Sequence, residues 1–193
     1  MVLTRDEFML RKNKYLKAIR EGAIFIYPTD TVYGIGCDAT NNKAVYRVRQ
    51  LKNRMVMPIS IVAPSKEWIY ENCEAPAEWV ERLPGPYTLA LPIKKQGAVA
   101  ANVTMGRDTV GVRIPSHWIA DIVKELGFPI IGTSANMTGH EVMKRLEDLP
   151  REFIQEVDFI IYEGEKRGQQ STLVDLTGKN KPKNDHVPNA KWT

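Results

Sequence analysis

The sequence predicts an α/β protein in which helices flank an open, twisted sheet of mixed parallel and antiparallel strands. Segments with the helical spacing of apolar residues alternate along the chain with short apolar runs of strand length, which is typical of this class. The rigid turn Pro84-Gly85-Pro86 and the alternating pattern of residues 109–114 indicate that some strands pair antiparallel. The length of 193 residues suits one domain, which we place at residues 1–178, with a tail at residues 179–193.

Capping signals mark the helices of the N-terminal half. Thr4 and Glu7 have the spacing of a capping box and open a helix that ends at Gly22. Asn41 or Asn42 caps the next helix, whose apolar residues recur with helical spacing. The elements expected here are a helix at about 4–21, a strand at 23–27, a helix to about Leu51, a strand at 58–63, and short helices after Ser65 and Pro76.

The C-terminal half alternates in the same way. Ser116 is expected to cap a helix that ends at Gly127. The elements expected here are strands at 87–93 and 109–114, that helix, a strand at 130–133, a charged helix at about 142–155, and strands at 158–162 and 171–176. From Gly178 the chain is rich in Lys, Asn and Pro without an apolar period, so residues 179–193 are expected to form a flexible basic tail.

The composition indicates a globular, intracellular chain. It is 43% hydrophobic and 26% charged, and its net charge of +4 favours anionic partners such as nucleotides or RNA, although a solvated basic surface gives the same value. Cys37 and Cys73 have no metal-ligand spacing, so we expect reduced thiols that pack in the core. The N-terminus lacks an apolar signal core, and no run approaches the ~20 apolar residues that span a bilayer. These features predict a cytoplasmic protein with no membrane contact.

Polar residues gather where predicted strands begin or end. The clusters are Thr29-Asp30-Thr31, Thr133-Ser134-Ala135-Asn136 and residues 168–172, with Lys52-Asn53-Arg54 at a helix C-terminus. Ligands of open α/β sheets bind beyond the carboxyl ends of strands, and these clusters supply hydroxyls, an amide and cations for a small polar or anionic ligand. Each cluster also has a structural explanation, because Ser, Thr and Asp stabilise turns and basic residues complement a helix dipole.

Arg113 is harder to explain structurally. It lies in the apolar run 110–114, where an unpaired charge is costly, so it requires either a protein carboxylate or an anionic ligand as its partner. The chain has no P-loop, nucleophile elbow or zinc spacing, and His117, His140 and His186 share no ligand spacing and are expected at the surface.

Together these segments resemble the YrdC-like family, the threonylcarbamoyl-adenylate synthases. The matching segments cover about residues 20–178 in the family's order and read YPTDTVYGIGCDA, LKNR, PISIV, LPGPYTLALP, TVGVRIPSH, GTSANMTG and STLVDLT. The pairs Lys52/Arg54 and Ser134/Asn136 are the most specific part of the match. The resemblance implies a sheet that surrounds a positively charged concave cavity.

The resemblance also implies a reaction and its site. Family members make L-threonylcarbamoyladenylate and pyrophosphate from L-threonine, bicarbonate and ATP with Mg²⁺, and no metal site built from protein ligands is expected. A downstream threonylcarbamoyl transferase complex then modifies adenosine 37 of tRNA. By matching position, the residues that would contact threonine are Thr31, Arg113, Ser134 and Ser171. Those that would bind ATP are Lys52, Arg54, Thr109 and Asn136, with Lys52 and Arg54 also neutralising charge in the catalysed step.

Alternative functions remain open at this point. A non-catalytic paralogue of the same fold that binds double-stranded RNA or tRNA is the strongest, because the apolar Met55-Val56-Met57 and the arginine-free tail depart from the family pattern. The intact Lys52/Arg54 and Ser134/Asn136 pairs favour the enzyme. A carbamoyltransferase like the hydrogenase maturation proteins would carry cysteine-rich zinc domains, whereas this chain has two cysteines. A scaffolding role is the remaining alternative.

Overall fold

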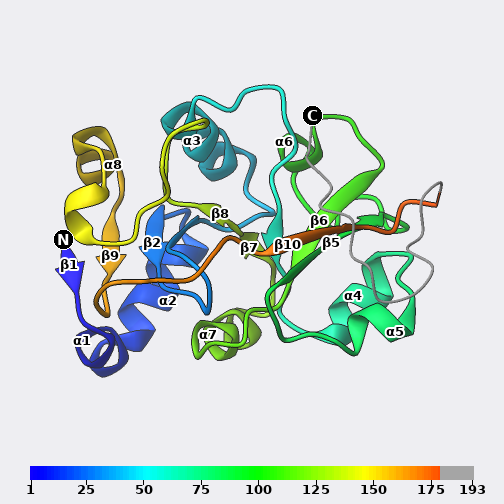
Figure 1. Cartoon of the computed structure of the whole chain (residues 1–193), viewed down its shortest axis with the longest axis horizontal. Coiled ribbons are helices and arrows are strands. Elements are labelled where there is room, and N and C mark those ends of the chain that lie inside the picture. The colour runs from blue at the N-terminus through cyan, green and yellow to red at the C-terminus, as the bar shows by residue number, and fades with distance from the viewer. Residues whose placement is uncertain (179–193) are drawn as a thin grey trace.

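The computed structural model describes residues 1–178, in which ten short strands form two five-stranded sheets with helices packed around them (Figure 1). The flexible tail that the sequence predicts at residues 179–193 lies outside the described residues. Within residues 1–178, none of the helices is both long enough and apolar enough to traverse a lipid bilayer. The predicted α/β class with mixed strand pairing is confirmed, although the sheet is divided into two.

The first sheet contains a hairpin that carries the first polar cluster. Its spatial order is β1 (Val2–Leu3), β9 (Phe159–Ile161), β2 (Phe25–Tyr27), β3 (Gly34–Gly36) and β8 (Thr133–Ser134). β9 is parallel to β1 and β2, whereas β3 is antiparallel to β2 and β8. Residues 28–33 therefore connect the two strands of the β2–β3 hairpin. The sequence does not predict β1 and β3.

The second sheet contains most of the longer apolar strands. Its spatial order is β10 (Thr172–Asp175), β5 (Tyr87–Pro92), β6 (Thr109–Arg113), β4 (Ile61–Val62) and β7 (Ile130–Ile131). β5 and β6 are antiparallel, as the turn before β5 indicates, whereas β10 and β4 run parallel to β5 and β6 respectively. β4 and β7 are antiparallel.

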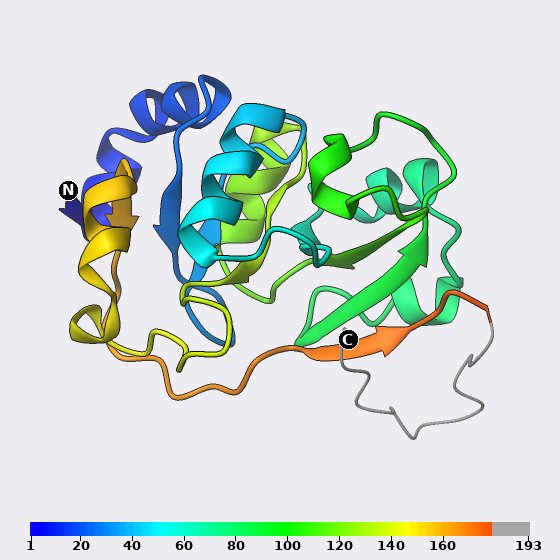
Figure 2. The same cartoon turned by 90° about the horizontal axis from the view of Figure 1, so that it is seen from above.

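The two sheets are joined along β7 and β8, which follow one another in the chain. The Ile131 amide donates to the Cys37 carbonyl beyond β3 at 2.9 Å, and the Gly132 amide donates to the Ser60 carbonyl before β4 at 2.8 Å. A second connection is the segment 163–171 between β9 and β10, which runs along one side of the molecule from the first sheet to the second (Figure 2, orange). Polar residues at strand ends in both sheets are thereby brought to a common region.

Helices cover both sheets, and several begin where the sequence predicts. They are α1 (Arg5–Leu10), α2 (Lys12–Arg20), α3 (Asn42–Lys52), α4 (Lys66–Asn72), α5 (Ala77–Val80), α6 (Ala101–Thr104), α7 (Ile119–Leu126) and α8 (Arg151–Glu156). The capping box of Thr4 and Glu7 is present, and the Asn41 side chain caps α3. The short helix α6 is not predicted from the sequence.

The helix expected at residues 4–21 is broken into α1 and α2 at Arg11. The break lets two aromatic rings from the two helices stack, with Phe8 and Tyr15 centroids 5.4 Å apart. Tyr15 also packs on Phe159 of β9 at 4.9 Å. Burial of these rings against the first sheet therefore overrides the continuous helical pattern.

Two other helix predictions are wrong in their bounds. The single helix expected at about 142–155 is replaced by a 3₁₀ turn, Leu146–Asp148, followed by α8. Pro150 disfavours a helical conformation of the residue before it. In addition, the Asp148 side chain accepts hydrogen bonds from the amides of Lys144 and Arg145. Ser116 does not cap α7, because the helix begins at Ile119 and Trp118 is the N-cap residue; the Ser116 amide donates to Asp30 instead.

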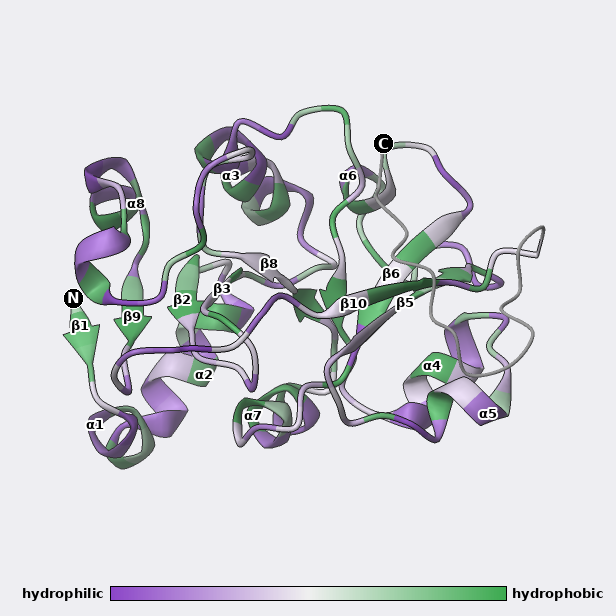
Figure 3. Ribbon diagram, viewed as in Figure 1, coloured by the Kyte–Doolittle hydropathy of each residue, from purple (hydrophilic) through white to green (hydrophobic). Residues whose placement is uncertain are grey.

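The core follows the predicted burial pattern. Strand side chains such as Ile35, Leu89 and Val112 are fully buried, and the hydrophobic strands contrast with the hydrophilic 163–171 connection (Figure 3). Cys37 and Cys73 are free thiols in this core, as predicted. Burial raises the pKa of the Cys73 thiol to about 11, which keeps it protonated and unreactive near neutral pH.

Candidate functional site

A cavity of about 1010 Å³ lies where the strand ends of the two sheets meet. The residues around it include Thr31 of the hairpin, Thr88 of β5, Arg113 of β6, Ser134 of β8 and Ser171 before β10. A second cavity of about 360 Å³ adjoins the first, since Arg54 and Ser134 line both, and it is lined in addition by Lys52 and Asn136. The structure thus gathers most of the predicted site residues in one place.

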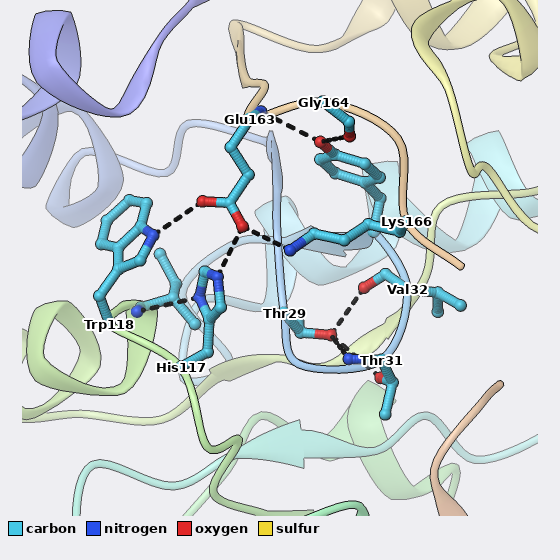
Figure 4. A network of polar contacts seen from close by, with 10 residues as sticks. Thr29, Thr31, Val32, His117, Trp118, Glu163, Gly164 and Lys166 are labelled. Atoms are coloured by element: carbon cyan, nitrogen blue, oxygen red, sulfur yellow. Dashed lines mark hydrogen bonds and ion pairs between the residues drawn. The ribbon is translucent and has the colours of Figure 1, made fainter. Parts of the chain in front are cut away.

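The hairpin turn explains the polar cluster after β2. The Thr29 hydroxyl donates to the Val32 carbonyl at 2.7 Å and accepts from the Thr31 amide at 3.1 Å (Figure 4). Thr29 therefore stabilises the turn with its side chain, which is the structural role considered for this cluster from the sequence. The Thr31 hydroxyl lies 3.0 Å from that of Thr29 and 3.2 Å from a guanidinium nitrogen of Arg113. Thr29 therefore shapes the turn, and Thr31 presents its hydroxyl to the cavity.

The same hairpin packs its glycines on a buried ring. A Cβ atom on Gly34 would lie 2.8 Å from the Tyr27 ring, and one on Gly36 would lie 2.7 Å from it. The Tyr27 hydroxyl in turn donates to the Ile131 carbonyl at 2.9 Å, which ties the hairpin to β7. The two glycines are thus required by close packing between neighbouring strands.

Arg113 is buried and has a protein carboxylate as a partner. Its Nη2 lies 2.6 Å from Asp30 Oδ1, and Asp30 Oδ2 accepts from the Ser116 amide at 3.0 Å. The Arg113 Nε atom is also buried and has no hydrogen-bond partner within residues 1–178. The guanidinium lines the larger cavity, and its Nη1 and Nη2 atoms each have a second N–H beyond those directed at Thr31 and Asp30, which is available to a ligand.

Lys52 is almost fully buried at the end of α3, with 1% exposure. Its Nζ donates to the Ser134 carbonyl at 2.6 Å, the Asn136 carbonyl at 2.8 Å and Asn136 Oδ1 at 3.3 Å. Burial, and secondarily the charge of Arg54, lowers the pKa of Lys52 to about 7. The three oxygens suit the three donors of an ammonium group, although none of them carries a charge.

Ser134 and Asn136 are oriented by one another and by neighbouring backbone. The Ser134 hydroxyl donates to Asn136 Oδ1 at 2.6 Å, and Asn136 Nδ2 donates to the His140 carbonyl at 2.6 Å. Thr138 fastens the same loop to α3, because its amide and hydroxyl both donate to the Lys52 carbonyl at 3.0 Å. Three of the four residues in the two most specific pairs, Lys52, Ser134 and Asn136, therefore form one hydrogen-bonded unit.

Arg54 reaches both cavities because α3 ends with Asn53 in the left-handed conformation, at φ 49°. Burial lowers the pKa of Arg54, and its buried Nε has no partner within residues 1–178. The loop that carries it is held by Arg49, whose guanidinium donates to the carbonyls of Arg54 at 2.6 Å and Met57 at 2.8 Å.

Arg49 is a supporting residue of the site that sequence reasoning missed, and it acts through the Arg54 loop because it lines neither cavity. It is 1% exposed and also donates to the carbonyls of Asn102 and Val103. The available signal was its spacing, since Arg49 stands four residues after Val45 on the buried face of the helix.

Of the two remaining predicted site residues, Ser171 lies at the larger cavity and Thr109 does not. Ser171 lines the larger cavity, and its hydroxyl lies 2.7 Å from that of Thr88. Thr109 lies at the other end of β6 from Arg113, opposite Pro92 of β5, and does not line either cavity. The structure therefore brings together the predicted residues apart from Thr109.

His117 corrects the expectation of surface histidines. It is half-buried, and its Nε2 lies 2.8 Å from Glu163 Oε1 (Figure 4). Burial lowers the pKa of His117, although the neighbouring Glu163 raises it in part. Among residues 1–178, no three His, Cys, Asp or Glu side chains are grouped so that they could hold a metal ion.

The structure is thus an α/β protein whose two adjoining cavities are lined by polar side chains together with Lys52, Arg54 and Arg113. The chain belongs to the Sua5/YciO/YrdC family, whose sequence model, described as telomere recombination, matches residues 17–184. The resemblance inferred from the motifs is thus confirmed for the family.

Curated relatives include threonylcarbamoyl-AMP synthases of two organisms. The protein of Pyrococcus abyssi is 38% identical over 167 residues, which cover 82% of this chain and 48% of the relative. The protein of Idiomarina loihiensis is 37% identical over 155 residues, which cover 76% of this chain and 82% of the relative. The chain therefore spans about half the length of the P. abyssi relative.

Solved structures share the fold. P. abyssi Sua5 complexed with L-threonine matches with a TM-score of 0.79 and 33% identity, over 91% of this chain and 54% of that one. Escherichia coli YciO matches with a TM-score of 0.80 over 93% of this chain and 92% of that one, and at 24% identity it shows the fold alone.

Proposed function

We propose that the chain is a threonylcarbamoyl-AMP synthase, which makes L-threonylcarbamoyladenylate and pyrophosphate from L-threonine, bicarbonate and ATP. The observation that carries the proposal is the pair of adjoining cavities, one with hydroxyls around Arg113 and the other with Lys52, Arg54 and Asn136. The names of the relatives and the threonine complex of P. abyssi Sua5 support the same substrates. The reaction class is nucleotidyl transfer.

Threonine is assigned to the larger cavity. The Arg113 guanidinium, which lines the cavity, would hold the carboxylate of the amino acid. The hydroxyls of Thr31, Ser134 and Ser171 would bond the amino and hydroxyl groups, because all three line the same cavity. A site that bonds the substrate hydroxyl discriminates strongly against an analogue that lacks it.

ATP is assigned to the adjoining cavity and the cations at its border. Within residues 1–178, no carboxylate forms an ion pair with Arg54 or with the ammonium form of Lys52, so both favour binding of phosphates, and bound phosphates would in turn favour the ammonium form. Asn136 offers an amide beside them. Thr109, expected from its matching position to bind ATP, carries no part of this assignment because it lies away from both cavities.

The chemistry requires positioning more than a covalent nucleophile. The threonine amine adds to CO₂ derived from bicarbonate, which forms a new C–N bond and gives a carbamate with loss of the amine proton. A carbamate oxygen then attacks the α-phosphorus, and the bond from phosphorus to pyrophosphate breaks. Lys52 and Arg54 would stabilise the negative charge that moves to the departing pyrophosphate.

Mg²⁺ would enter this site with ATP. The ion commonly retains water and binds through substrate phosphates with few protein ligands. The ion would contribute charge neutralisation at the phosphates.

The product would serve the modification of tRNA. Threonylcarbamoyladenylate is an activated mixed anhydride, so a downstream transferase complex would have to pass its threonylcarbamoyl group to adenosine 37 of tRNA. A non-catalytic RNA-binding paralogue is the alternative outcome of the test that follows.

Pyrophosphate release tests the proposal directly. We expect release from ATP with Mg²⁺ when both threonine and bicarbonate are present, and none when either is omitted. Replacing threonine with valine should abolish release, because valine leaves the hydroxyl-binding groups unpaired. Pyrophosphate release that is absent, or indifferent to threonine, would exclude the synthase, and tight binding of RNA by the same preparation would then favour the paralogue.

A further inference from the structure

The segment 163–171, which we call the strap, forms part of the cavity wall. It crosses from β9 in the first sheet to β10 in the second (Figure 2) and is hydrophilic along its length (Figure 3). Its last residues, from Gly168 to Ser171, line the larger cavity. The strap therefore connects the two sheets at the point where both contribute residues to the proposed threonine site.

Three donors hold the carboxylate of Glu163, which is the first residue of the strap. Its carboxylate accepts from His117 Nε2 at 2.8 Å and from Trp118 Nε1 at 2.9 Å, and it also pairs with Lys166 of the strap itself (Figure 4). Burial alone would raise the pKa of Glu163, but the bonds from Lys166, Trp118 and His117 outweigh it and lower the pKa. Glu163 is thus a charged acceptor at neutral pH.

The histidine contact has a defined polarity. The Ile119 amide, at the first residue of α7, donates to His117 Nδ1 at 3.4 Å. Because Nδ1 accepts, Nε2 carries the proton and donates to Glu163. Glu163 therefore holds the 116–118 segment that leads into α7.

That segment reaches the threonine site in two steps. The amide of Ser116, adjacent to His117, donates to Asp30 Oδ2, and Asp30 Oδ1 pairs with Arg113 Nη2. Arg113 then contacts the Thr31 hydroxyl. A change in the position of the 116–118 segment would be transmitted to the guanidinium through Asp30.

The strap also reaches the site directly. The Glu163 amide donates to the Tyr33 hydroxyl at 3.1 Å, and this hydroxyl donates to the Gly164 carbonyl at 2.6 Å. Farther along, Gly168 packs so closely on the hairpin that a Cβ atom would lie 2.3 Å from the Thr31 carbonyl oxygen. The strap thus lies against the backbone of Thr31.

We propose that Glu163 is a positioning residue for amino-acid binding: by holding both the strap and the 116–118 segment, it aligns Arg113 and Thr31 with Ser171 around one substrate. This inference rests on the proposed function. Glu163 does not line either cavity, so it acts through its neighbours and not by contact with a substrate. Among residues 1–178, Lys52 and Arg54 make no hydrogen bond with Glu163, His117 or Trp118, and the strap reaches their cavity only through Gln170, so that end should depend on Glu163 much less.

Replacing Glu163 with glutamine is the primary test. Glutamine has the size of glutamate, but its side-chain NH₂ group is a donor where the carboxylate had an acceptor. One of the N–H donors around residue 163 is therefore left without an acceptor. We expect Glu163→Gln to raise the KM for threonine about tenfold, the size expected for loss of a charged hydrogen-bond acceptor, while the KM for ATP changes less than about twofold. Glu165→Gln is the matched control, because Glu165 lies in the same strap and forms an exposed ion pair with Arg167.

Trp118→Phe is a milder second variant that removes one donor to Glu163 and keeps a ring beside Phe8. It should raise the KM for threonine in the same direction by a smaller factor. An unchanged threonine KM in folded Glu163→Gln, or equal increases for threonine and ATP, would overturn the inference, since the latter outcome indicates general loosening.

Hydrogen exchange separates this inference from the proposed function. Glu163→Gln should accelerate amide exchange in residues 29–33 and 163–171, and Glu165→Gln should not. If the native chain shows no threonine-dependent pyrophosphate release, the proposed function fails, and exchange then decides by itself whether Glu163 holds the cavity wall. Unchanged exchange in both segments would show that it does not.

Discussion

The two ends of the site hold their cations in different ways. Arg113 is paired with Asp30, whereas Lys52 is surrounded by uncharged oxygens, and Arg54 has no carboxylate partner within residues 1–178. An ion pair neutralises charge and fixes orientation, whereas carbonyl dipoles fix orientation and leave the net charge in place. The Arg113 end is therefore suited to a zwitterion that must be held in one geometry, and the Lys52 end to a polyanion.

Truncation of Arg113 should give the largest effect and tests the first half of this comparison. We expect Arg113→Ala to weaken threonine binding by roughly 2–5 kcal/mol, because both the ligand carboxylate and Asp30 lose their partner. ATP affinity should change little. Arg113→Lys should also be damaging, since a point charge cannot replace the guanidinium fork.

Calorimetry with each substrate would check this, with Arg107→Ala as the control at an exposed arginine just before β6. Lost ATP affinity with intact threonine affinity would reverse the assignment of the two ends.

Lys52→Met tests the second half and should give a smaller loss. We expect ATP affinity to fall by about 1.5–3 kcal/mol, the range for hydrogen bonds to a charged group, because the loop of Ser134 and Asn136 loses the ammonium group that holds it. Threonine binding without ATP should fall less. Lys43→Met, at an exposed position of α3, is the matched control. Titrations with ATP would give the dissociation constants. Equal ATP affinities of the Lys52→Met and Lys43→Met variants would contradict the assignment of ATP to the Lys52 end.

Proton uptake should accompany ATP binding, and this is the smallest expected effect. The pKa of Lys52 is about 7 in the free protein, so between about pH 7 and 9 the amine is increasingly neutral, and nearby phosphates would raise its pKa and favour the ammonium form. Each binding event should therefore take up as much as about one proton near pH 8, and affinity should fall as pH rises.

Binding enthalpies measured in buffers of different ionisation enthalpy would detect this uptake. Lys52→Met supplies the background value that comes from ATP alone. An uptake that persists unchanged in the variant would place the proton on another group.

The sequence predicts this site better at some positions than at others, for physical reasons. Thr31, Arg113 and Ser134 are predictable because polar residues at the end of an apolar strand or inside one need a partner. Arg49 and Glu163 are not singled out, because a single arginine on a helix or a single glutamate after a strand is ordinarily a solvated charge. Their importance depends on the carbonyls and donors that distant segments bring to them.

Prediction of the fold from the sequence is limited in the same way, because contacts between distant segments are not visible in a local pattern. Caps such as Thr4 and Asn41 are encoded within a few residues and are predicted correctly. The break at Arg11 and the loss of a helix before Pro150 depend on ring packing against β9 and on the Asp148 side chain, neither of which a periodic pattern contains. The hairpin strand β3 is short and glycine-rich, so it lacks a hydrophobic signal of its own.

The packing of Gly34 and Gly36 on Tyr27 has a consequence for how such sequences diverge. A gene copy released from selection for catalysis could exchange Thr31 or Arg113 without disturbing that contact, whereas any larger residue at position 34 or 36 would meet the ring. The tyrosine and the two glycines should therefore persist through duplication and change of activity as a record of descent. Inheritance of the hairpin would then mark the lineage, and the hydroxyl and guanidinium beside it would mark which descendants kept the ancestral chemistry.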